Sequence, residues 1–407
     1  MSENLERPFW FAGSFNDHPQ VRKGMKIPKK VELCDLTLDE NGEGMAGAYL
    51  AEGEKMEIAR ALDDLGIQRI GLLGFPSPIT EDQMEAAKKI RHLGLRAKFQ
   101  VLATSRDDVD RALEVEPWSV TLRRPVSEIY SLESEPAEKK KNDFVQLAQY
   151  VRQNGIRVGM MAQDITRADF EAARHIIVSV HERVGLDELC VTDTQGVAHP
   201  FSFFFLIQEV KKWVDVPISV HCHNYLGMAV ANSCAAVAGG AEIVHSTFNG
   251  MGHLAGITAT EEVAVALTVA FDVDLGIRYE KLYPVAKLVE KYTGIGMHLH
   301  KPVTGEMAFS KSEETRDILN LMKRKEAGKL KGLFPFLPEF VGNRAKVVMA
   351  EKVTPLAVRY NLEEMGLAAT EDQLSRIHGR VRDLARRNRR MISQDELKKI
   401  AEEFFRE

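Results

Sequence analysis

The feature that most constrains this chain is a repeated alternation of short apolar runs with longer amphipathic stretches. Short apolar runs rich in β-branched residues predict buried strands, whereas apolar residues at every third or fourth position predict helices. Eight such runs, each followed by a helical stretch of roughly ten to twenty residues, indicate eight consecutive βα units. The predicted strands span residues 31–36, 70–74, 97–104, 119–124, 157–164, 188–193, 217–223 and 242–249.

The number and span of these units favour a closed barrel over an open sheet. Eight βα units in roughly 240 residues match the size of a TIM barrel. An open doubly wound sheet usually carries a glycine-rich phosphate loop after its first strand, and no such loop follows residues 31–36. We therefore predict an α/β fold, a TIM (β/α)8 barrel, whose functional side chains collect at the C-terminal ends of the strands.

The chain on either side of the barrel shows other patterns. Residues 1–30 mix aromatic residues with glycine, asparagine and proline and show no period, so we expect a loop arm that packs on the body. We place the barrel domain at residues 31–280, and a linker with a smaller, mainly helical C-terminal subdomain at residues 281–407. Helices predicted in this last part span residues 283–292, 370–387 and 393–405, the last one capped by Ser393.

Charge and apolar patterning exclude several classes of protein. The 407 residues carry a formal net charge of -5 with both signs mixed, so neither nucleic acid nor an anionic membrane is expected as a partner. No apolar run approaches the roughly 18 residues of a membrane span, and no leader pattern opens the chain, so we expect a cytoplasmic protein. Four scattered cysteines are expected as buried free thiols, and they are Cys34, Cys190, Cys222 and Cys234.

Two histidines lie at the end of the seventh predicted strand, in the sequence Pro-Ile-Ser-Val-His-Cys-His-Asn. Because side chains alternate between the two faces of a strand, His221 and His223 point to the same side. Two neutral imidazoles suit a divalent metal such as Zn, Mn, Fe or Co, whereas Mg and Ca prefer oxygen ligands. Ordinary strand histidines produce the same spacing. The position of this strand in the fold therefore decides whether the pair is interpreted as a metal site.

The order of the barrel strands supplies an anionic ligand for this pair. The seventh and first strands lie two places apart around the ring, so a carboxylate at the end of the first strand faces the histidines across the barrel mouth. Asp35 and Glu40 are the candidates. We therefore predict a divalent metal centre at the mouth, with Zn or Mn favoured over Fe, Co or Mg.

Two further clusters are interpreted as structural. His298 and His300 form a second His-x-His pair, but they lie in a Gly/Pro-rich linker with no carboxylate nearby. Four arginines between Arg386 and Arg390 form a basic run at the end of a predicted helix. In a chain of net negative charge, this run favours a solvated helix terminus over a nucleic-acid patch.

Several strand ends carry motifs in a fixed order, and together they resemble the DRE-TIM metallolyase superfamily. Its members include isopropylmalate, homocitrate and citramalate synthases and hydroxymethylglutaryl-CoA lyase. The resemblance covers residues 31–272, and residues 301–309 and 338–342 are similar to the linker subdomain of the synthase branch. The motifs are Asp35-Leu-Thr-Leu-Asp-Glu40, Gly74-Phe-Pro76, Asp193-Thr-x-Gly196, His221-x-His223-Asn224, Gly227 and Ala231-Asn232.

The resemblance implies a role for individual residues. The family's metal ligands fall on Glu40, His221 and His223, and its substrate-carboxylate threonine falls on Thr194. Asp35 matches an aspartate that holds hydrogen bonds around the ligands. The substrate-contacting positions are Thr194, Asp39 and Asn224, and Asn232 matches another residue that shapes the mouth of the seventh strand.

The chain departs from the family at several of its functional positions. Asp39 stands where the family has an arginine that supports negative charge on the keto oxygen or enolate. Ile257 replaces an asparagine that often ligates the metal, and Tyr225 replaces an aspartate. Arg316 stands where the synthase linker has a histidine of the catalytic base. The resemblance therefore retains the three metal ligands, while the groups that handle the enolate differ.

Either another cation replaces the missing arginine or the substrate no longer needs one. Candidate cations at neighbouring strand ends are Arg123, Arg124, Arg167 and His253. Arg123 and Arg124 are adjacent and therefore lie on opposite faces, so no more than one of them enters the barrel mouth. The alternative is that the two arginines form a charged pair on the rim that faces the helices. His253 and Tyr225 are the candidates for the catalytic base.

The resemblance implies a metal-dependent condensation of an acyl-CoA, such as acetyl-CoA, with a 2-oxo acid. A lyase or aldolase that cleaves a hydroxy acid or hydroxyacyl-CoA is the first alternative, and a degenerate barrel with a binding role is the second. The synthase-like linker favours condensation, whereas Arg316 favours cleavage. Because the family's linker reaches the neighbouring subunit, we also expect a homodimer.

Overall fold

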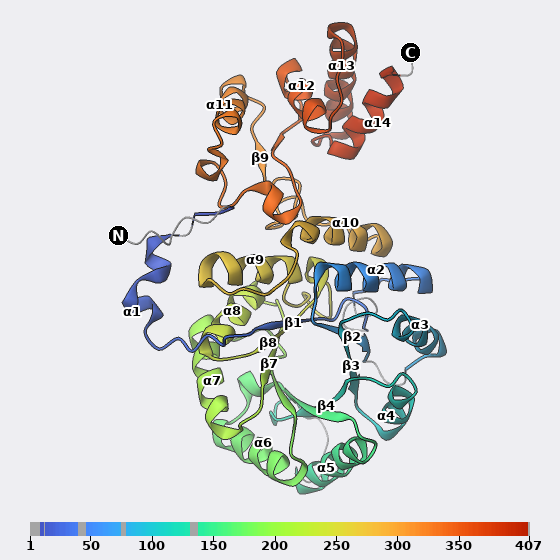
Figure 1. Cartoon of the computed structure of the whole chain (residues 1–407), viewed down its shortest axis with the longest axis vertical. Helices are drawn as coiled ribbons and strands as arrows, with labels where there is room; N and C mark the ends of the chain where they lie inside the picture. Colours follow the sequence, from blue (N-terminus) through green and yellow to red (C-terminus); the bar gives the residue numbers. More distant parts are fainter. Residues whose placement is uncertain (1–8, 12, 40–45, 75–78, 131–136, 406–407) are drawn as a thin grey trace. The chain divides into compact units, whose positions relative to one another are not determined.

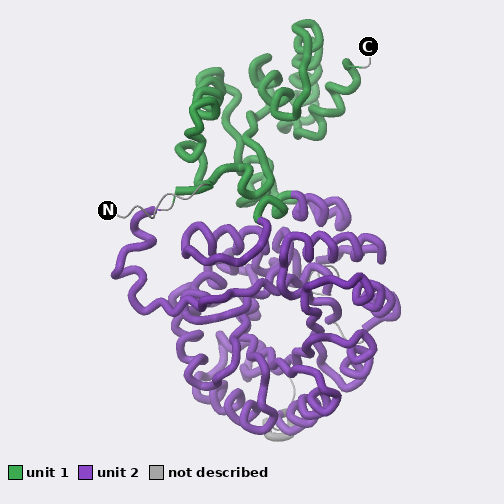
Figure 2. The backbone as a smooth tube through the Cα atoms, viewed as in Figure 1, with its two compact units in different colours: residues 1–12, 279–283, 297–407 green, residues 13–278, 284–296 purple. Residues whose placement is uncertain are grey.

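The computed structural model describes residues 9–11, 13–39, 46–74, 79–130 and 137–405. It divides into two compact units, shown in Figure 2. Residues 13–278 with 284–296 form the barrel unit, and residues 1–12 with 279–283 and 297–407 form the C-terminal unit. Among the described residues, no helix combines the length and apolarity that crossing a membrane requires.

The barrel unit is built on eight parallel strands that close into a ring in chain order, because β8 pairs with β1 (Figure 1). The TIM barrel predicted from the sequence is therefore confirmed, and each predicted strand is present close to its expected bounds. The strands are β1 (Glu32–Asp35), β2 (Arg69–Leu73), β3 (Lys98–Ala103), β4 (Ser119–Pro125), β5 (Arg157–Gln163), β6 (Glu188–Asp193), β7 (Ile218–Cys222) and β8 (Ile243–Ser246).

The helices between the strands surround the ring (Figure 1). Most of them are amphipathic, and the first begins with Glu52 and ends at Leu65. Gly66 caps this helix with a φ of 99°, which favours a residue without a side chain. Thr80 caps the next helix by accepting a hydrogen bond from the Gln83 backbone N–H. The helices are α2 (Glu52–Leu65), α3 (Glu81–Arg91), α4 (Arg106–Leu113), α5 (Ala137–Gln153), α6 (Phe170–Val184), α7 (Pro200–Trp213), α8 (Ala229–Gly239), α9 (Thr260–Phe271) and α10 (Leu282–Thr293).

The N-terminal arm differs from the predicted loop, because it contains two short helical segments. They are a 3-10 turn at Ser14–Asp17 and α1 at Pro19–Arg22. The His18 ring accepts a hydrogen bond from the Gln20 backbone N–H, and Pro19 has the φ that the first helical position needs. A helix of four residues is too short to show a hydrophobic period, so the sequence pattern could not reveal it.

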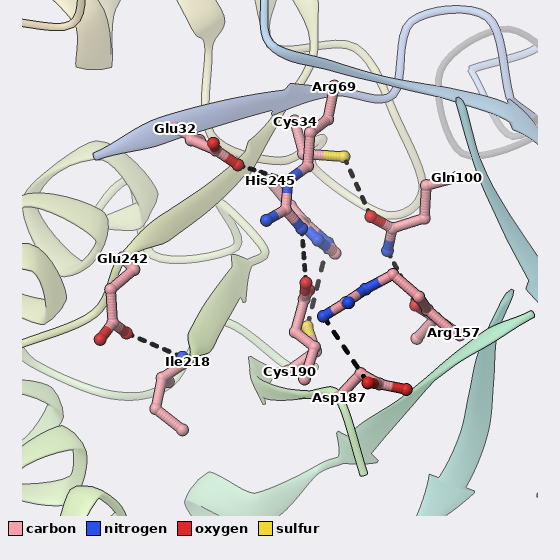
Figure 3. A network of polar contacts seen from close by, with 12 residues as sticks. Glu32, Cys34, Arg69, Gln100, Arg157, Asp187, Cys190, Ile218, Glu242 and His245 are labelled. Atoms are coloured by element: carbon pink, nitrogen blue, oxygen red, sulfur yellow. Dashed lines mark hydrogen bonds and ion pairs between the residues drawn. The ribbon is translucent and has the colours of Figure 1, made fainter. Parts of the chain in front are cut away.

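Charged side chains meet at the N-terminal ends of the strands, where Figure 3 shows them. The Arg69 guanidinium on β2 donates to Glu32 on β1 at 2.6 Å and to Glu188 on β6 at 2.5 Å, and all three side chains are buried. Burial alone would raise the pKa of Glu32, but Lys30 and Arg69 hold it below the usual value. The Arg69 guanidinium also lies 4.7 Å from the Trp118 ring centre. This ion-paired cluster ties three strands together at the base of the barrel.

The C-terminal unit is mainly helical, as predicted. Its two-stranded sheet pairs β9 (Ser310–Lys311) with β10 (Lys346–Val347). The arm residue Phe9 accepts a hydrogen bond from the Leu337 backbone N–H, and the rings of Phe9 and Trp10 pack on Phe340. The helices are α11 (Thr315–Glu326), α12 (Pro355–Glu364), α13 (Glu371–Asn388) and α14 (Gln394–Phe405).

A capping box fixes the start of α14, as the sequence predicted for Ser393. The Ser393 hydroxyl accepts from the Glu396 N–H at 3.2 Å, and the Ser393 N–H donates to the Glu396 carboxylate at 2.9 Å. Ser393→Ala should lower the free energy of unfolding by about 1 kcal/mol, because one N–H of the first helical turn loses its acceptor. Urea unfolding measures this loss. Ser393→Thr retains the hydroxyl, so an equal loss in both variants would contradict a capping role.

Candidate active site

Two histidines at the end of β7 form the centre of the site. The ring centres of His221 and His223 lie 5.1 Å apart, so the predicted same-face arrangement is confirmed. Both side chains are buried, and burial lowers the pKa of His223 to about 4 and that of His221 well below its usual value. Both rings are therefore neutral at physiological pH, which is the form that ligates a metal.

The hydrogen bonds of these rings leave nitrogen atoms available for a ligand. The Nδ1 of His223 lies 3.3 Å from the His253 carbonyl oxygen, and donation to this oxygen leaves Nε2 without a proton. The Nδ1 of His221 is buried and has no hydrogen-bond partner within the described part of the chain. A buried imidazole nitrogen without a partner is costly, and a bound divalent metal would satisfy it. The two imidazoles therefore fit a metal.

The predicted carboxylate ligand Glu40 lies outside the described residues. The order β7, β8, β1 confirms that the first and seventh strands lie two places apart around the ring. No group of three metal-binding side chains occurs among the residues that the structure describes. The role of Glu40 as the anionic ligand therefore stays a prediction.

Asp35, the alternative carboxylate, is engaged by the protein itself. The backbone N–H of Thr37 donates to Oδ1 at 3.0 Å, and the Thr260 hydroxyl donates to Oδ2 at 2.7 Å. These bonds join the end of β1 to the start of α9. Asp35 therefore fixes the backbone at Thr37 and the start of α9 at Thr260, while its role around the metal ligands stays a prediction.

Burial raises the pKa of Asp35 from 3.8 to about 6, which makes the folded state more stable at low pH. The folded form binds the proton more tightly than the unfolded form, so the contribution of Asp35 to stability should fall by roughly 2 to 3 kcal/mol as the pH rises from about 4 to about 7. Asp35→Asn should lack this fall, because the amide does not ionise. Urea unfolding at both pH values measures it, and equal pH dependence in the two proteins would contradict the assignment.

Asp39 points into the barrel, where it lines a small internal cavity with Gly71. A Cβ added to Gly71 would lie 3.0 Å from the Asp39 Oδ2 and 2.6 Å from Leu36 Cδ2, so only glycine leaves room for this carboxylate. Asp39 is buried. The sequence alone did not reveal the part played by Gly71, because a glycine within a strand pattern does not show which side chain approaches it.

The predicted substrate residue Thr194 already has partners in the protein. Its hydroxyl accepts from the Asp164 N–H at 2.8 Å and donates to the Thr192 hydroxyl at 3.2 Å. The neighbouring Gly196 has a φ of 61°, and a Cβ there would lie 2.7 Å from the His223 carbonyl oxygen. Gly196 therefore lets the loop after β6 approach the end of β7 closely. Thr194 and His223 are held by adjacent strands.

The structure separates the candidate cations. Thr121 lines the internal cavity, so Arg123 two residues further along β4 shares the inner face. The Arg124 guanidinium lies 5.9 Å from the ring of Phe144 on α5 and thus faces the helices. Arg167 is paired with Asp164 at 2.9 Å. Of the three arginines, only Arg123 remains a candidate for the mouth, and burial lowers its pKa.

The remaining predicted residues lie on loops after the strands or outside the barrel unit. The His253 ring centre lies 6.0 Å from that of His223. Tyr225 is 60% exposed, so it is accessible to a ligand. The Asn224 side chain accepts from the Ala229 N–H at the start of α8. Arg316 belongs to α11 of the C-terminal unit, and its side chain is 87% exposed.

Asp193, the first residue of the Asp193-Thr-x-Gly196 motif, lies at the centre of a polar cluster, and sequence reasoning missed its partner Thr166. Its carboxylate accepts from the Thr166 hydroxyl at 2.8 Å and from the Asn232 amide at 3.3 Å. It therefore joins the loops after β5 and β6 to α8.

All four cysteines are buried free thiols, as predicted. The His298 and His300 ring centres lie 5.8 Å apart in the C-terminal unit.

The fold and the side chains at its strand ends together define the class of protein. A TIM barrel with neutral imidazoles and buried carboxylates at the C-terminal ends of its strands is the architecture of a barrel enzyme. Two solved structures support the fold. The chain matches hydroxymethylglutaryl-CoA lyases of Bacillus subtilis (TM-score 0.58, 19% identity, 67% of this chain and 97% of that one) and Pseudomonas aeruginosa (0.58, 20%, 66% and 95%).

Sequence comparisons then give the family. The family model described as HMGL-like matches residues 30–289. A probable 2-isopropylmalate synthase of Methanopyrus kandleri is 37% identical over 362 residues, which cover 88% of this chain and 70% of the relative. A homocitrate synthase of Methanothermobacter thermautotrophicus is 32% identical over 371 residues, covering 90% and 91%. The chain belongs to the DRE-TIM metallolyase superfamily, on its synthase branch, as the sequence motifs predicted.

Proposed function

We propose that the chain is a metal-dependent acyltransferase that condenses an acyl-CoA, such as acetyl-CoA, with a 2-oxo acid. The observation that carries the proposal is the pair of neutral, buried imidazoles at the end of β7, His221 and His223. Relatives named as isopropylmalate, homocitrate and citramalate synthases, each at least 32% identical to the chain, support the reaction class.

His221, His223 and Glu40 would hold the divalent metal, and Zn or Mn suits two imidazoles and one carboxylate. When bound, the metal supplies Lewis acidity toward the carbonyl and carboxylate oxygens of a 2-oxo acid. The His253 carbonyl fixes the orientation of the His223 ring through the contact at Nδ1. With the ring held in this way, the direction in which Nε2 offers its lone pair to the metal is fixed.

Thr194 would bind the carboxylate of the 2-oxo acid. Its hydroxyl now donates to the Thr192 oxygen at 3.2 Å, which is long for a bond between two hydroxyl groups. Rotation of the hydroxyl would redirect this proton to the substrate, while the oxygen still accepts from the Asp164 N–H. The buried position of Thr194 excludes water from the bond. Asn224 and Asp39 are further proposed substrate positions.

The acyl donor needs a base and a cation. His253, which is half-buried, would remove a proton from the acyl methyl group, and the exposed Tyr225 is the other candidate. Arg123 would stabilise the negative charge that develops on the acyl oxygen. Losing a preorganised donor of this kind costs about 2.7 to 4 kcal/mol, and a cation at Arg123 would recover the stabilisation that the replacement of the family arginine by Asp39 removes.

The reaction test is an incubation of metal-loaded protein with acetyl-CoA and a panel of 2-oxo acids. Condensation forms a carbon–carbon bond between the acyl methyl carbon and the keto carbon, and hydrolysis of the resulting thioester by water then releases free CoA. A thiol reagent detects the CoA, and we expect release that depends on one of the acids. Formation of pyruvate or acetoacetate from hydroxy acids, without condensation, would favour the lyase instead. Bound metal with neither reaction across the panel would favour a binding role. Sedimentation of the same sample tests the proposed homodimer.

A further inference from the structure

A hollow of about 590 Å³ lies at the C-terminal end of α13, within the C-terminal unit. None of the residues that line this hollow belongs to the barrel site. Its volume is in the range of pockets that bind small organic molecules. The lining consists of Ala350, Glu351, Ala385, Arg386, Arg389, Arg390 and Met391.

Positive charge dominates this hollow. Three of its lining residues are arginines and one is a glutamate. Arg386 lies 3.5 Å from the Glu351 carboxylate, and Arg390 pairs with Glu396 at 2.7 Å. Among the described residues, no carboxylate pairs with Arg389, whose side chain is exposed. An anionic ligand would therefore meet one unpaired guanidinium and two that are partly neutralised.

The backbone at the end of α13 fixes where these arginines lie. Arg389 adopts the left-handed conformation with a φ of 52°, and the Arg390 N–H donates to the Ala385 carbonyl. Arg390 also donates to the Met391 carbonyl at 3.0 Å and makes two bonds to Glu396. The helix dipole favours basic residues in the last turn of a helix, which explains Arg386 and Arg387. Arg389 and Arg390 lie beyond the last turn, so the dipole does not explain them.

The apolar part of the lining restricts the class of ligand. It consists of Ala350, Met391 and the buried Ala385. Inorganic phosphate would use the arginines but would leave this apolar lining without a partner. A ligand with a phosphate group and an apolar or planar part would use both, because guanidinium groups bind phosphate oxygens in pairs.

We propose that this hollow binds a small organic phosphate of the nucleotide class, with its phosphate on Arg389 and its base against the apolar lining residues. The ligand chemistry is shared by free nucleotides and by the nucleotide end of CoA. The site rests on the C-terminal unit alone, so it does not depend on the reaction proposed for the barrel.

Calorimetric titration of the full chain with ADP, adenosine 3′,5′-bisphosphate and inorganic phosphate, at about 0.15 M salt, tests the site. We expect saturable binding of at least one nucleotide and at least tenfold weaker binding of inorganic phosphate. Tighter binding of the 3′,5′-bisphosphate would assign the site to the end of CoA, and tighter binding of ADP would assign it to a free nucleotide.

Two substitutions on the same helix end separate a built site from general charge attraction. Arg389→Gly removes the guanidinium and suits the positive φ, so the fold is retained and binding should weaken at least tenfold. Arg387→Ala removes the same charge from a residue that does not line the hollow, and binding should change less than twofold. His223→Ala should leave this binding unchanged. Equal losses in the two arginine variants, or no saturable binding at millimolar nucleotide, would overturn the proposal.

Discussion

Replacing His223 with alanine should remove the bound divalent metal and lower the rate of the condensation by at least about 100-fold. Changing a residue that merely orients a ligand costs about 10 to 100-fold in metal affinity or activity, and loss of a ligand costs no less. The His223 ring is neutral because burial lowers its pKa to about 4. The substitution therefore removes a nitrogen lone pair that can bind the metal, and it leaves the charge of the protein unchanged. Metal content measured after gel filtration, and release of free CoA, give the two readouts.

His300→Ala is the matched control, because His300 belongs to the second His-x-His pair in the chain. It should retain both metal and activity. His223→Gln adds a second test, since the side chain keeps a polar group of similar length while losing the imidazole. Metal content that stays unchanged in His223→Ala would contradict the metal site. Metal loss without loss of activity would instead contradict the proposed reaction.

The barrel could be predicted because its strands are buried on both faces. Parallel strands of this kind read as short apolar runs, and the centre of β6, Leu189 to Val191, is both apolar and buried. The alternation of side chains along a strand then predicted that His221 and His223 share one face. These inferences need only local sequence and the order of strands around a ring.

The finer arrangement of the site could not be predicted, because it depends on contacts between residues far apart in the chain. Alternation shows that Arg123 and Arg124 point in opposite directions, but only the position of Phe144 on α5 shows that Arg124 faces the helices. In the same way, nothing near Asp39 in the sequence indicates that Gly71 leaves room for its carboxylate. The partners of charged residues inside the barrel come from other strands, as Glu32 and Glu188 do for Arg69, so periodicity along one strand gives no information about them.

Arg69→Ala should lower the free energy of unfolding of the barrel by about 3 to 5 kcal/mol. The substitution leaves the carboxylates of Glu32 and Glu188 buried without the cation that both contact at 2.6 and 2.5 Å. The contact of the guanidinium with the Trp118 ring is lost as well. Guanidinium chloride unfolding, followed by circular dichroism, measures the change.

Variants that remove the whole cluster distinguish ion pairing from packing. The triple substitution Glu32→Gln, Arg69→Met, Glu188→Gln replaces the charges with side chains of similar size, and it should recover much of the stability lost in Arg69→Ala. Removal of an exposed pair, by Arg390→Ala, should cost no more than about 1 kcal/mol. If Arg69→Ala were no more destabilising than Arg390→Ala, the two carboxylates would have to be protonated or solvated in the folded protein. The base of the barrel would then be held together by apolar packing alone.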